Sequence, residues 1–436
     1  MIHSTDISFS IISLGCSKNQ VDAEKLQGGL ISAGFFPAEE SSDADLLIIN
    51  TCGFITPAKE ESISVILDAL DMKSEPRDGV MPRRVAVTGC LSQRYFEALS
   101  ADMPEIDFLY GLLDDNFIPA MSRELQIALD GSPEESQVPL VRGLAYRYIK
   151  ISEGCSNNCS YCAIPLIRGP LRSISPGEIL DDVRAAAADG ALEINLIGQD
   201  TALYRHGNTG LAELLALVSG VPGIRWIRVL YCHPDHVTPE IIEALASIEK
   251  VVPYIDLPFQ HVSTPILKSM NRGGSYDIYR DLVTRVRDRV PDIRIRSTFM
   301  TGYPGEKESD FKEILDFLSE MKLDRVGAFT FSPEEDTAAA LLKETVSPRR
   351  AKKRHDRLMS LQQKISEEKL RAVIGQRIPA LVEEQIDEKT WVGRSIYDAP
   401  EVDGVFYLTG EPLKGNSIVT AEVTDAVEYD LIGVVS

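Results

Sequence analysis

The sequence lacks any apolar run close to the ~20 residues that a membrane span requires. Its first six residues, MIHSTD, also lack the basic start and apolar stretch of a signal peptide. Both absences predict a cytoplasmic chain with no membrane partner. In that compartment its 7 cysteines are poor candidates for structural disulfides. They are better candidates for metal ligands, redox thiols or small buried side chains.

Positive charge is scarce as well. The chain has 45 Lys and Arg against 66 Asp and Glu, a formal net charge of −21. An acidic surface repels phosphate backbones and attracts basic partners, so the balance weighs against a nucleic-acid substrate. The sequence has no internal repeat and no low-complexity segment. At 436 residues the chain is too long for one core and predicts about two to four domains.

The first part of the chain alternates short apolar runs with helical patterns. Strands are predicted at 7–14, 46–49 and 85–87, with helices over 21–35 and from Pro57. This alternation is typical of a parallel α/β sheet. The polar, turn-rich residues 130–136 then predict a linker.

Beyond the linker the alternation resumes on a larger scale. Six apolar runs, separated by helical patterns, are predicted strands: 148–151, 194–197, 226–231, 254–257, 293–299 and 326–331. Six β/α units predict an incomplete barrel whose function lies at the carboxyl ends of its strands.

The C-terminal part changes character. A charged helix over 348–372 is predicted to be a solvated connection. Short strands follow at 378–382, 391–397, 405–408 and 418–423, with glycines between them, which predicts a small antiparallel β-barrel. The predicted fold is therefore α/β in three domains. A parallel-sheet domain spans 6–122, a partial (β/α)6 barrel spans 141–372, and a β-barrel spans 375–436.

The strongest local motif is the group Cys155, Cys159 and Cys162, spaced C-x3-C-x2-C directly after the first strand of the predicted (β/α)6 barrel. Three thiolates on one loop can hold three irons of a 4Fe–4S cube and leave the fourth iron open for a substrate or cofactor. The alternatives are a zinc loop and an incidental group. Structural zinc uses four protein ligands, and no fourth Cys or His follows at zinc-finger spacing. The motif favours an iron–sulfur cluster.

Three further cysteines each follow an apolar run of the first domain: Cys16, Cys52 and Cys90. The carboxyl ends of parallel strands share one edge of a sheet, where ligands bind, so these side chains should converge. Three buried cysteines without a ligand are the alternative. Their equivalent positions favour a second metal site.

The seventh cysteine, Cys232, has no partner by position and is predicted to be a core residue. His233 and His236 flank Pro234, and a turn explains these residues better than a metal site.

The three-cysteine loop resembles the signature of the radical S-adenosylmethionine (SAM) superfamily. The resemblance implies that SAM chelates the open iron. One electron from the cluster, which needs an electron donor as a partner, then cleaves SAM to methionine and a 5′-deoxyadenosyl radical. Tyr161 matches the aromatic position near the adenine, and Gly198, Gln199 and Asp200 stand where a glycine–acidic motif meets the SAM amino group. For these last three residues a strand-end turn is the alternative. The sequence leaves the catalytic residues unknown.

Along the whole chain, the combination of both cysteine sets with a terminal barrel resembles the methylthiotransferases. In that family an N-terminal domain holds a second 4Fe–4S cluster, a radical SAM barrel follows, and a TRAM β-barrel helps hold a macromolecular substrate. The resemblance implies two 4Fe–4S clusters and two uses of SAM. One SAM methylates a sulfur carried on the N-terminal cluster. The other yields the radical that abstracts hydrogen from an inert carbon, to which the methylthio sulfur bonds.

The family has two branches. One modifies adenosine beside the tRNA anticodon, and the other modifies the β-carbon of an aspartate in small-subunit ribosomal protein twelve. The segment SLGCSKNQVD at 13–22 and the segment GAFTFSPEE at 327–335 are similar to the ribosomal-protein branch. Ser17, Gln20 and Ala23 depart from the commonest pattern of that branch, but none is a predicted ligand.

Charge gives a separate argument on the substrate. Residues 376–436 contain four basic and twelve acidic residues, a net charge of −8. A barrel that grips tRNA should be basic, whereas an acidic one suits a basic ribosomal protein. The sequence therefore predicts the ribosomal-protein enzyme, with the tRNA enzyme as the alternative. An iron–sulfur carrier or sensor is a further alternative, but it would not need an open iron beside a six-strand barrel.

Overall fold

The computed structural model describes residues 2–75, 82–134, 136–141, 143–410 and 413–435. Contacts divide the chain into two compact units. The first unit comprises Met1–Arg142, Gly154–Ser156 and Ala163–Pro170, and the second comprises Gly143–Glu153, Asn157–Cys162 and Leu171–Ser436. None of the helices in the described residues combines the length and apolar character that a membrane crossing requires.

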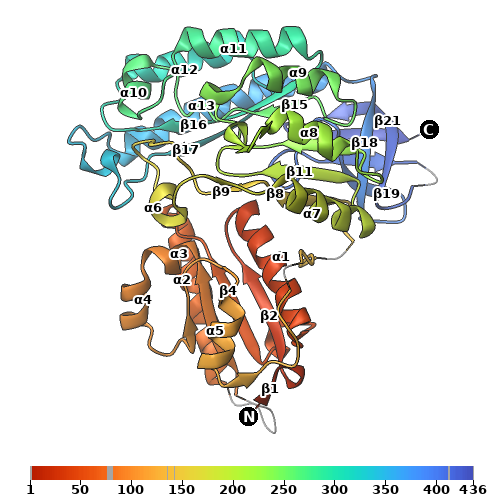
Figure 1. Ribbon diagram of the computed structural model, residues 1–436. Coiled ribbons are helices and arrows are strands. Elements are labelled where there is room, and N and C mark those ends of the chain that lie inside the picture. The colour runs from red at the N-terminus through yellow and green to blue at the C-terminus, as the bar shows by residue number, and fades with distance from the viewer. Residues whose placement is uncertain (1, 76–81, 135, 142, 411–412, 436) are drawn as a thin grey trace. The chain divides into compact units, whose positions relative to one another are not determined.

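The first unit is built on a five-stranded parallel sheet of order β3-β2-β4-β5-β6. The strands are β2 (Ser8–Ser13), β3 (Phe36–Pro37), β4 (Leu46–Thr51), β5 (Arg84–Gly89) and β6 (Phe108–Leu109). The helices are α1 (Ser17–Ser32), α2 (Thr56–Ser74), α3 (Cys90–Arg94), α4 (Phe96–Asp102) and α5 (Phe117–Glu124). Figure 1 shows these helices around the sheet. The predicted parallel α/β sheet is confirmed.

The central strand β4 is buried over its whole length because helices cover both faces of the sheet. Leu46 and Ile48 belong to a core with side chains of α1 and α5. Leu47 and Ile49 belong to a second core with side chains of α2, α3 and α4. Alternate residues of a strand point to opposite faces, so a continuous apolar run is required here.

The predicted linker is bound back to the first unit. Just before it, β7 (Ile127–Ala128) pairs in parallel with β1 (Ile2–His3). The Asp130 carboxylate accepts hydrogen bonds from the backbone and hydroxyl of Thr5. Further on, the Val138 N–H donates to the Glu24 carbonyl. Residues 135 and 142 lie outside the described residues. The polar composition of this segment correctly indicated that its described residues form no long helix or strand, but it could not show these long-range contacts.

The second unit contains six parallel strands in two sheets, ordered β8-β11-β14 and β15-β16-β17. They are β8 (Tyr146–Lys150), β11 (Glu193–Ile197), β14 (Trp226–Val229), β15 (Tyr254–Asp256), β16 (Arg294–Thr301) and β17 (Arg325–Thr330). An isolated parallel bridge joins Ile227 of β14 to Val251, which precedes β15 in the chain. All six predicted barrel strands are confirmed.

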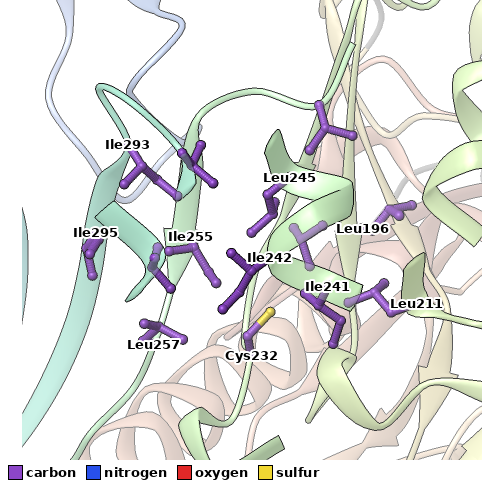
Figure 2. Packing of buried hydrophobic residues seen from close by; sticks show 14 of the residues in the cluster. Leu196, Leu211, Cys232, Ile241, Ile242, Leu245, Ile255, Leu257, Ile293 and Ile295 are labelled. Atoms are coloured by element: carbon purple, nitrogen blue, oxygen red, sulfur yellow. The ribbon is translucent and has the colours of Figure 1, made fainter. Parts of the chain in front are cut away.

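Helices cover the outside of these two sheets (Figure 1). They are α7 (Pro176–Ala188), α8 (Leu211–Ser219), α9 (Pro239–Ser247), α10 (Thr264–Ser269), α11 (Tyr276–Arg289), α12 (Glu308–Met321) and α13 (Pro348–Arg371). Figure 2 shows the Cys232 side chain among the residues of this core, near Ile241 and Ile242 of α9. The prediction that Cys232 is a core residue is confirmed. Helix α13 is less solvated than predicted, because Arg354 is buried and pairs with Glu306 at 2.8 Å.

The C-terminal residues of the second unit form a closed barrel of order β18-β19-β20-β22-β21. Its strands are β18 (Arg377–Gln385), β19 (Thr390–Ser395), β20 (Phe406–Thr409), β21 (Ser417–Ala426) and β22 (Leu431–Val435). The four predicted strands are present. The fifth, β22, was missed because Gly433 interrupts its pattern. A Cβ at Gly433 would stand 2.5 Å from the Glu422 carbonyl oxygen and 2.7 Å from the Phe406 ring, so only glycine fits there.

Buried ion pairs join this terminal barrel to the first residues of the (β/α)6 strands. Glu193 opens β11, and its carboxylate accepts from the Arg228 Nε at 2.8 Å and from the Arg394 Nη2 at 2.6 Å. Burial alone would raise the pKa of Glu193, but the two guanidinium groups hold it below its ordinary value. A further ion pair, Arg325–Asp398, and two tyrosine hydrogen bonds, Tyr254–Asp403 and Tyr146–Glu401, join the same parts. The opposite, carboxyl ends of the six strands therefore stay available for a site.

Candidate functional site

The structure places Cys16, Cys52 and Cys90 at the carboxyl ends of three adjacent strands. Cys16 follows β2 and precedes α1, Cys52 directly follows β4, and Cys90 opens α3 directly after β5. The backbone brings the first two close, because a Cβ at Gly15, the neighbour of Cys16, would stand only 2.7 Å from the Cys52 sulfur. The three cysteines thus share one edge of the sheet, as the spacing of the apolar runs predicted.

Asn19 braces this edge from the first turn of α1. Its side chain is buried, and its Nδ2 donates to the carbonyls of Leu14 at 2.9 Å and Thr51 at 3.0 Å. Its Oδ1 lies 3.7 Å from the Cys90 sulfur. The side-chain amide of Asn19 therefore contacts the chain at the carboxyl ends of β2, β4 and β5. Sequence reasoning did not assign Asn19 a role, although it stands within the segment that resembles the ribosomal-protein branch.

Two thiols of this first site, those of Cys52 and Cys90, are buried, whereas Cys16 is exposed. Burial raises the pKa of Cys90 to about 12 and also raises the pKa of Cys52, while the guanidinium of Arg168 opposes the rise at both cysteines. Buried thiolates are costly without a cation nearby. A metal that takes thiolate ligands removes that cost, so three converging cysteines fit an iron–sulfur centre.

Cys155, Cys159 and Cys162 occupy the loop between β9 (Ser152–Glu153) and α6 (Ile164–Arg168). Cys155 belongs to the first compact unit, where its N–H donates to the Gly169 carbonyl at 3.0 Å. Cys159 and Cys162 belong to the second unit, and the Cys162 N–H donates to the Cys159 carbonyl at 3.0 Å. Cys159 and Cys162 are partly exposed, which suits ligands of a centre that must admit a cofactor.

The loop residues of the second unit are held at the carboxyl ends of the six parallel strands. Ser160 donates its N–H to the Met270 carbonyl and accepts at its own carbonyl from Ala339. The Tyr161 hydroxyl accepts from Arg272 Nη1 at 3.3 Å. Tyr161 packs beside the apolar residues around Met300 and Tyr303, and burial raises its pKa. Its ring is therefore fixed beside the cysteines, as an adenine-contacting residue would have to be.

The predicted glycine–acidic motif also contacts this region. The Gln199 amide donates to Glu153 at 2.8 Å, and Asp200 accepts from the Asn157 amide at 2.7 Å. A Cβ at Gly198 would stand 2.4 Å from the Ser152 hydroxyl, so glycine permits the close approach. Gly198, Gln199 and Asp200 each meet residues just before or within the cysteine loop, which a simple strand-end turn would not require.

Two histidines complete the surroundings of Asp200. His233 and His236 flank the 3-10 turn Pro234–His236, so the predicted turn is present. The His236 Nδ1 lies 2.7 Å from the Asp200 carboxylate, and the His233 N–H donates to it at 3.2 Å. Burial would raise the pKa of Asp200, but its bond to His236 and the neighbouring charges lower it overall. The contact with His236 was not predicted.

A metal ion could bridge these residues, since ligand atoms of Asp200, His233 and His236 lie within 4.8 Å of one another. The hydrogen bonds from Asn157 and the His233 backbone, together with the contact to His236, already engage the carboxylate. The turn and these contacts account for the arrangement without a metal.

Six parallel β/α strands with a C-x3-C-x2-C loop at their carboxyl ends define a radical SAM enzyme. The Radical SAM superfamily model matches residues 149–318. The model of the uncharacterised protein family UPF0004 matches residues 8–111, and the TRAM domain model matches residues 374–435. The three models match successive parts of the chain, in the order UPF0004, Radical SAM superfamily and TRAM domain.

Full-length relatives narrow the class. The chain is 42% identical to the ribosomal protein uS12 methylthiotransferase RimO of Syntrophotalea carbinolica, over 97% of this chain and 96% of that protein. It is 41% identical to the RimO of Heliobacterium modesticaldum, over 97% and 94% of the two chains. The chain belongs to the ribosomal protein uS12 methylthiotransferase family.

Solved structures of lower identity share the fold. The radical SAM methyltransferase TsrM from Kitasatospora setae superposes with a TM-score of 0.55 at 14% identity, over 74% of this chain and 72% of that one. The cobalamin-dependent SAM radical enzyme OxsB gives a TM-score of 0.52 at 13% identity, over 83% and 56%. At this identity the likeness concerns the fold alone.

Proposed function

We propose that this chain transfers a methylthio group to ribosomal protein uS12, at the β-carbon of an aspartate. The observation that carries the proposal is identity of about 40% over 97% of the chain to uS12 methylthiotransferases. The two predicted cysteine sets support it, because the Cys16, Cys52 and Cys90 set converges at one sheet edge and the other set occupies one loop.

The proposed cofactors are two 4Fe–4S clusters and SAM. Cys16, Cys52 and Cys90 would hold one cluster through three thiolates, and Cys155, Cys159 and Cys162 would hold the other. Each set supplies three sulfur ligands, which leaves one iron of each cube without a protein ligand. When bound, these groups supply the one-electron and sulfur chemistry that no side chain offers.

The other residues of the site position the cysteine sets and would orient SAM. Asn19 fixes the strand ends that carry the first cysteine set. Tyr161, held by Arg272, presents an aromatic surface beside the second set. Asp200 keeps a negative charge beside the cysteine loop and is positioned by Asn157 and His236, which suits a contact with the SAM ammonium group.

The charge argument about the substrate needs correction. Four of the twelve acids counted in the C-terminal residues already have partners: Glu383 and Asp398 pair with arginines, while Glu401 and Asp403 accept hydrogen bonds from tyrosines. Glu411 lies outside the described residues. The acids that remain exposed include Glu384, Glu388, Glu422 and Glu428. The barrel surface is acidic, but less so than the total of −8 indicated.

Mass spectrometry tests the proposal. Ribosomal protein uS12 and bulk tRNA would be compared from cells with the chain, cells without it, and cells expressing the Cys159→Ala variant. A gain of one methylthio group on uS12, dependent on Cys159, is expected. A methylthio group that appears on tRNA adenosine and not on uS12 would establish the alternative activity.

A further inference from the structure

The short helix α6 (Ile164–Arg168) brings a buried cation to the Cys16, Cys52 and Cys90 site. This helix follows the loop of Cys155, Cys159 and Cys162 in sequence, yet it folds with the first compact unit. There it packs on α3, whose first residue is Cys90. Cys90, Ala163 and Ile167 form a small apolar core, with Leu112 against it. Arg168, the last residue of α6, is thereby fixed beside the site.

The Arg168 guanidinium is held from several sides. Its Nε donates to the Cys90 sulfur at 3.4 Å, and its Nη2 donates to the Asn19 Oδ1 at 2.6 Å. The same Nη2 lies 3.1 Å from the Asp22 carboxylate, and the side chain is only 3% exposed. A planar guanidinium in such contacts cannot swing away from the sulfur, because movement would break the bonds at both nitrogens.

The hydrogen-bond partners of Arg168 indicate that its charge acts on the cysteine site. Asp22 alone would satisfy the cation, and it is the more exposed partner, at 14%. The Nε nonetheless points to a cysteine sulfur, and the Nη2 also reaches the amide that braces the cysteine-bearing strands. Charge-assisted N–H bonds to sulfur draw electron density from a thiolate ligand. In iron–sulfur centres, net charge and hydrogen bonds to sulfur set the reduction potential.

We propose that Arg168 is a positioning residue of the N-terminal cluster site, which stabilises the reduced state of the centre held by Cys16, Cys52 and Cys90. The inference rests on the proposed function, since it needs that centre to exist. Its consequence is that residues 155–168 supply the ligands of one proposed cluster and the cation that tunes the other.

The experiment isolates the N-terminal centre. A chain with Cys155, Cys159 and Cys162 replaced by Ala is reconstituted anaerobically with iron and sulfide, and about four irons are expected. In this background Arg168→Met removes the charge and the N–H groups. Arg168→Lys keeps the charge but loses the planar set of guanidinium N–H donors. Arg123→Met, on the exposed face of α5, changes the net charge equally and serves as the control.

The readout is a redox titration followed by electron paramagnetic resonance. Arg168→Met should lower the ratio of reduced to oxidised centre at a fixed potential by about tenfold, which corresponds to about 59 mV for one electron. Arg168→Lys should fall between Arg168→Met and the parent, and Arg123→Met should match the parent.

The failures are distinguishable. A parent chain that binds no iron would overturn the proposed cluster site itself. A parent with about four irons and an Arg168→Met potential equal to it would overturn the role of Arg168 alone. If Arg168→Met loads no iron, Arg168→Lys decides: a lowered potential supports the proposal, and an unchanged one overturns it. Loss of iron in both variants, with normal loading of Arg123→Met, would make Arg168 an assembly residue and also overturn it.

Discussion

The Asn157 amide, within the cysteine loop, donates a 2.7 Å hydrogen bond to the Asp200 carboxylate beyond β11. The loop that carries Cys159 and Cys162 is thus tied directly to the acidic residue predicted to meet the SAM amino group. His236 contacts the same carboxylate from the next strand–helix connection. The cysteine loop, the connection after β11 and the connection after β14 therefore meet at the Asp200 carboxylate.

This relationship predicts the effect of removing the charge. Asp200→Asn should weaken SAM binding about tenfold or more, because a charge-assisted bond to an ammonium group contributes about 1.5–3 kcal/mol. Anaerobic equilibrium dialysis of the reconstituted enzyme with labelled SAM measures it. Asp181→Asn, on the exposed face of α7, is the control and should bind normally. Unchanged affinity in Asp200→Asn would leave Asp200 with a purely structural role.

The two cysteine sets should have separable roles. Replacement of Cys16, Cys52 and Cys90 by Ala should leave about four of about eight irons. It should retain SAM cleavage to 5′-deoxyadenosine and abolish methylthio transfer. Replacement of Cys155, Cys159 and Cys162 should also leave about four irons and should abolish cleavage. Iron analysis and chromatography of the nucleoside products check both. Cleavage that persists in Cys159→Ala would contradict the assignment of the radical SAM cluster.

The main strands were predictable because local apolar patterns indicate them. All six barrel strands were found from apolar runs, and the three cysteines at strand ends followed from the geometry of a parallel sheet. Asn19, Arg168 and His236 were not assigned roles. Arg168 meets Asn19 across 149 residues of sequence, and no periodicity signals such a contact. Side-chain networks that tune a site are therefore the part that requires the structure.

The buried cluster at Glu193 predicts a stability effect. Glu193→Gln would leave Arg228 and Arg394 without their shared carboxylate, and breaking a buried pair costs about 3–5 kcal/mol. The urea midpoint should therefore fall markedly. Glu243→Gln breaks the pair with Arg289, in which both side chains are 54% exposed, and should leave the urea midpoint nearly unchanged. Equal midpoints for the two variants would show that the Glu193 pairs are not a major source of stability.

His233 predicts part of the acid response. Burial, reinforced by the charge of Arg272, lowers its pKa to about 4, whereas the unfolded side chain titrates near 6.5. Between these values the unfolded state binds more protons, so the folded state loses stability as pH falls through that window. At pH 5 the loss is at most about 2 kcal/mol. Urea midpoints at pH 7 and pH 5 should therefore differ less for His233→Asn than for the wild type. Parallel losses would assign the response to other groups.

The terminal barrel predicts how a basic substrate is captured. Glu383 pairs with Arg394, and Asp387 accepts the N–H groups of Lys389 and Thr390 in a turn, so neither can be reversed without structural damage. Glu384, Glu388, Glu422 and Glu428 are exposed and form the fair test. Reversing these four to Lys should slow association with uS12, because complementary charge steers encounter. Single reversals should have little effect.

The matched control reverses four exposed acids of the first unit, Asp68, Asp71, Glu97 and Asp102, and so changes the net charge equally. Association rates are measured by surface capture at low and at high salt, since screening limits charge effects to ~10 Å at 0.1 M. We expect the barrel reversal to slow association at low salt more than the control does, with the difference shrinking at high salt. Equal slowing by both would mean that total charge, and not the barrel surface, recruits the substrate. No slowing in either would remove charge from the argument for a basic protein substrate, which would then rest on the family relationship alone.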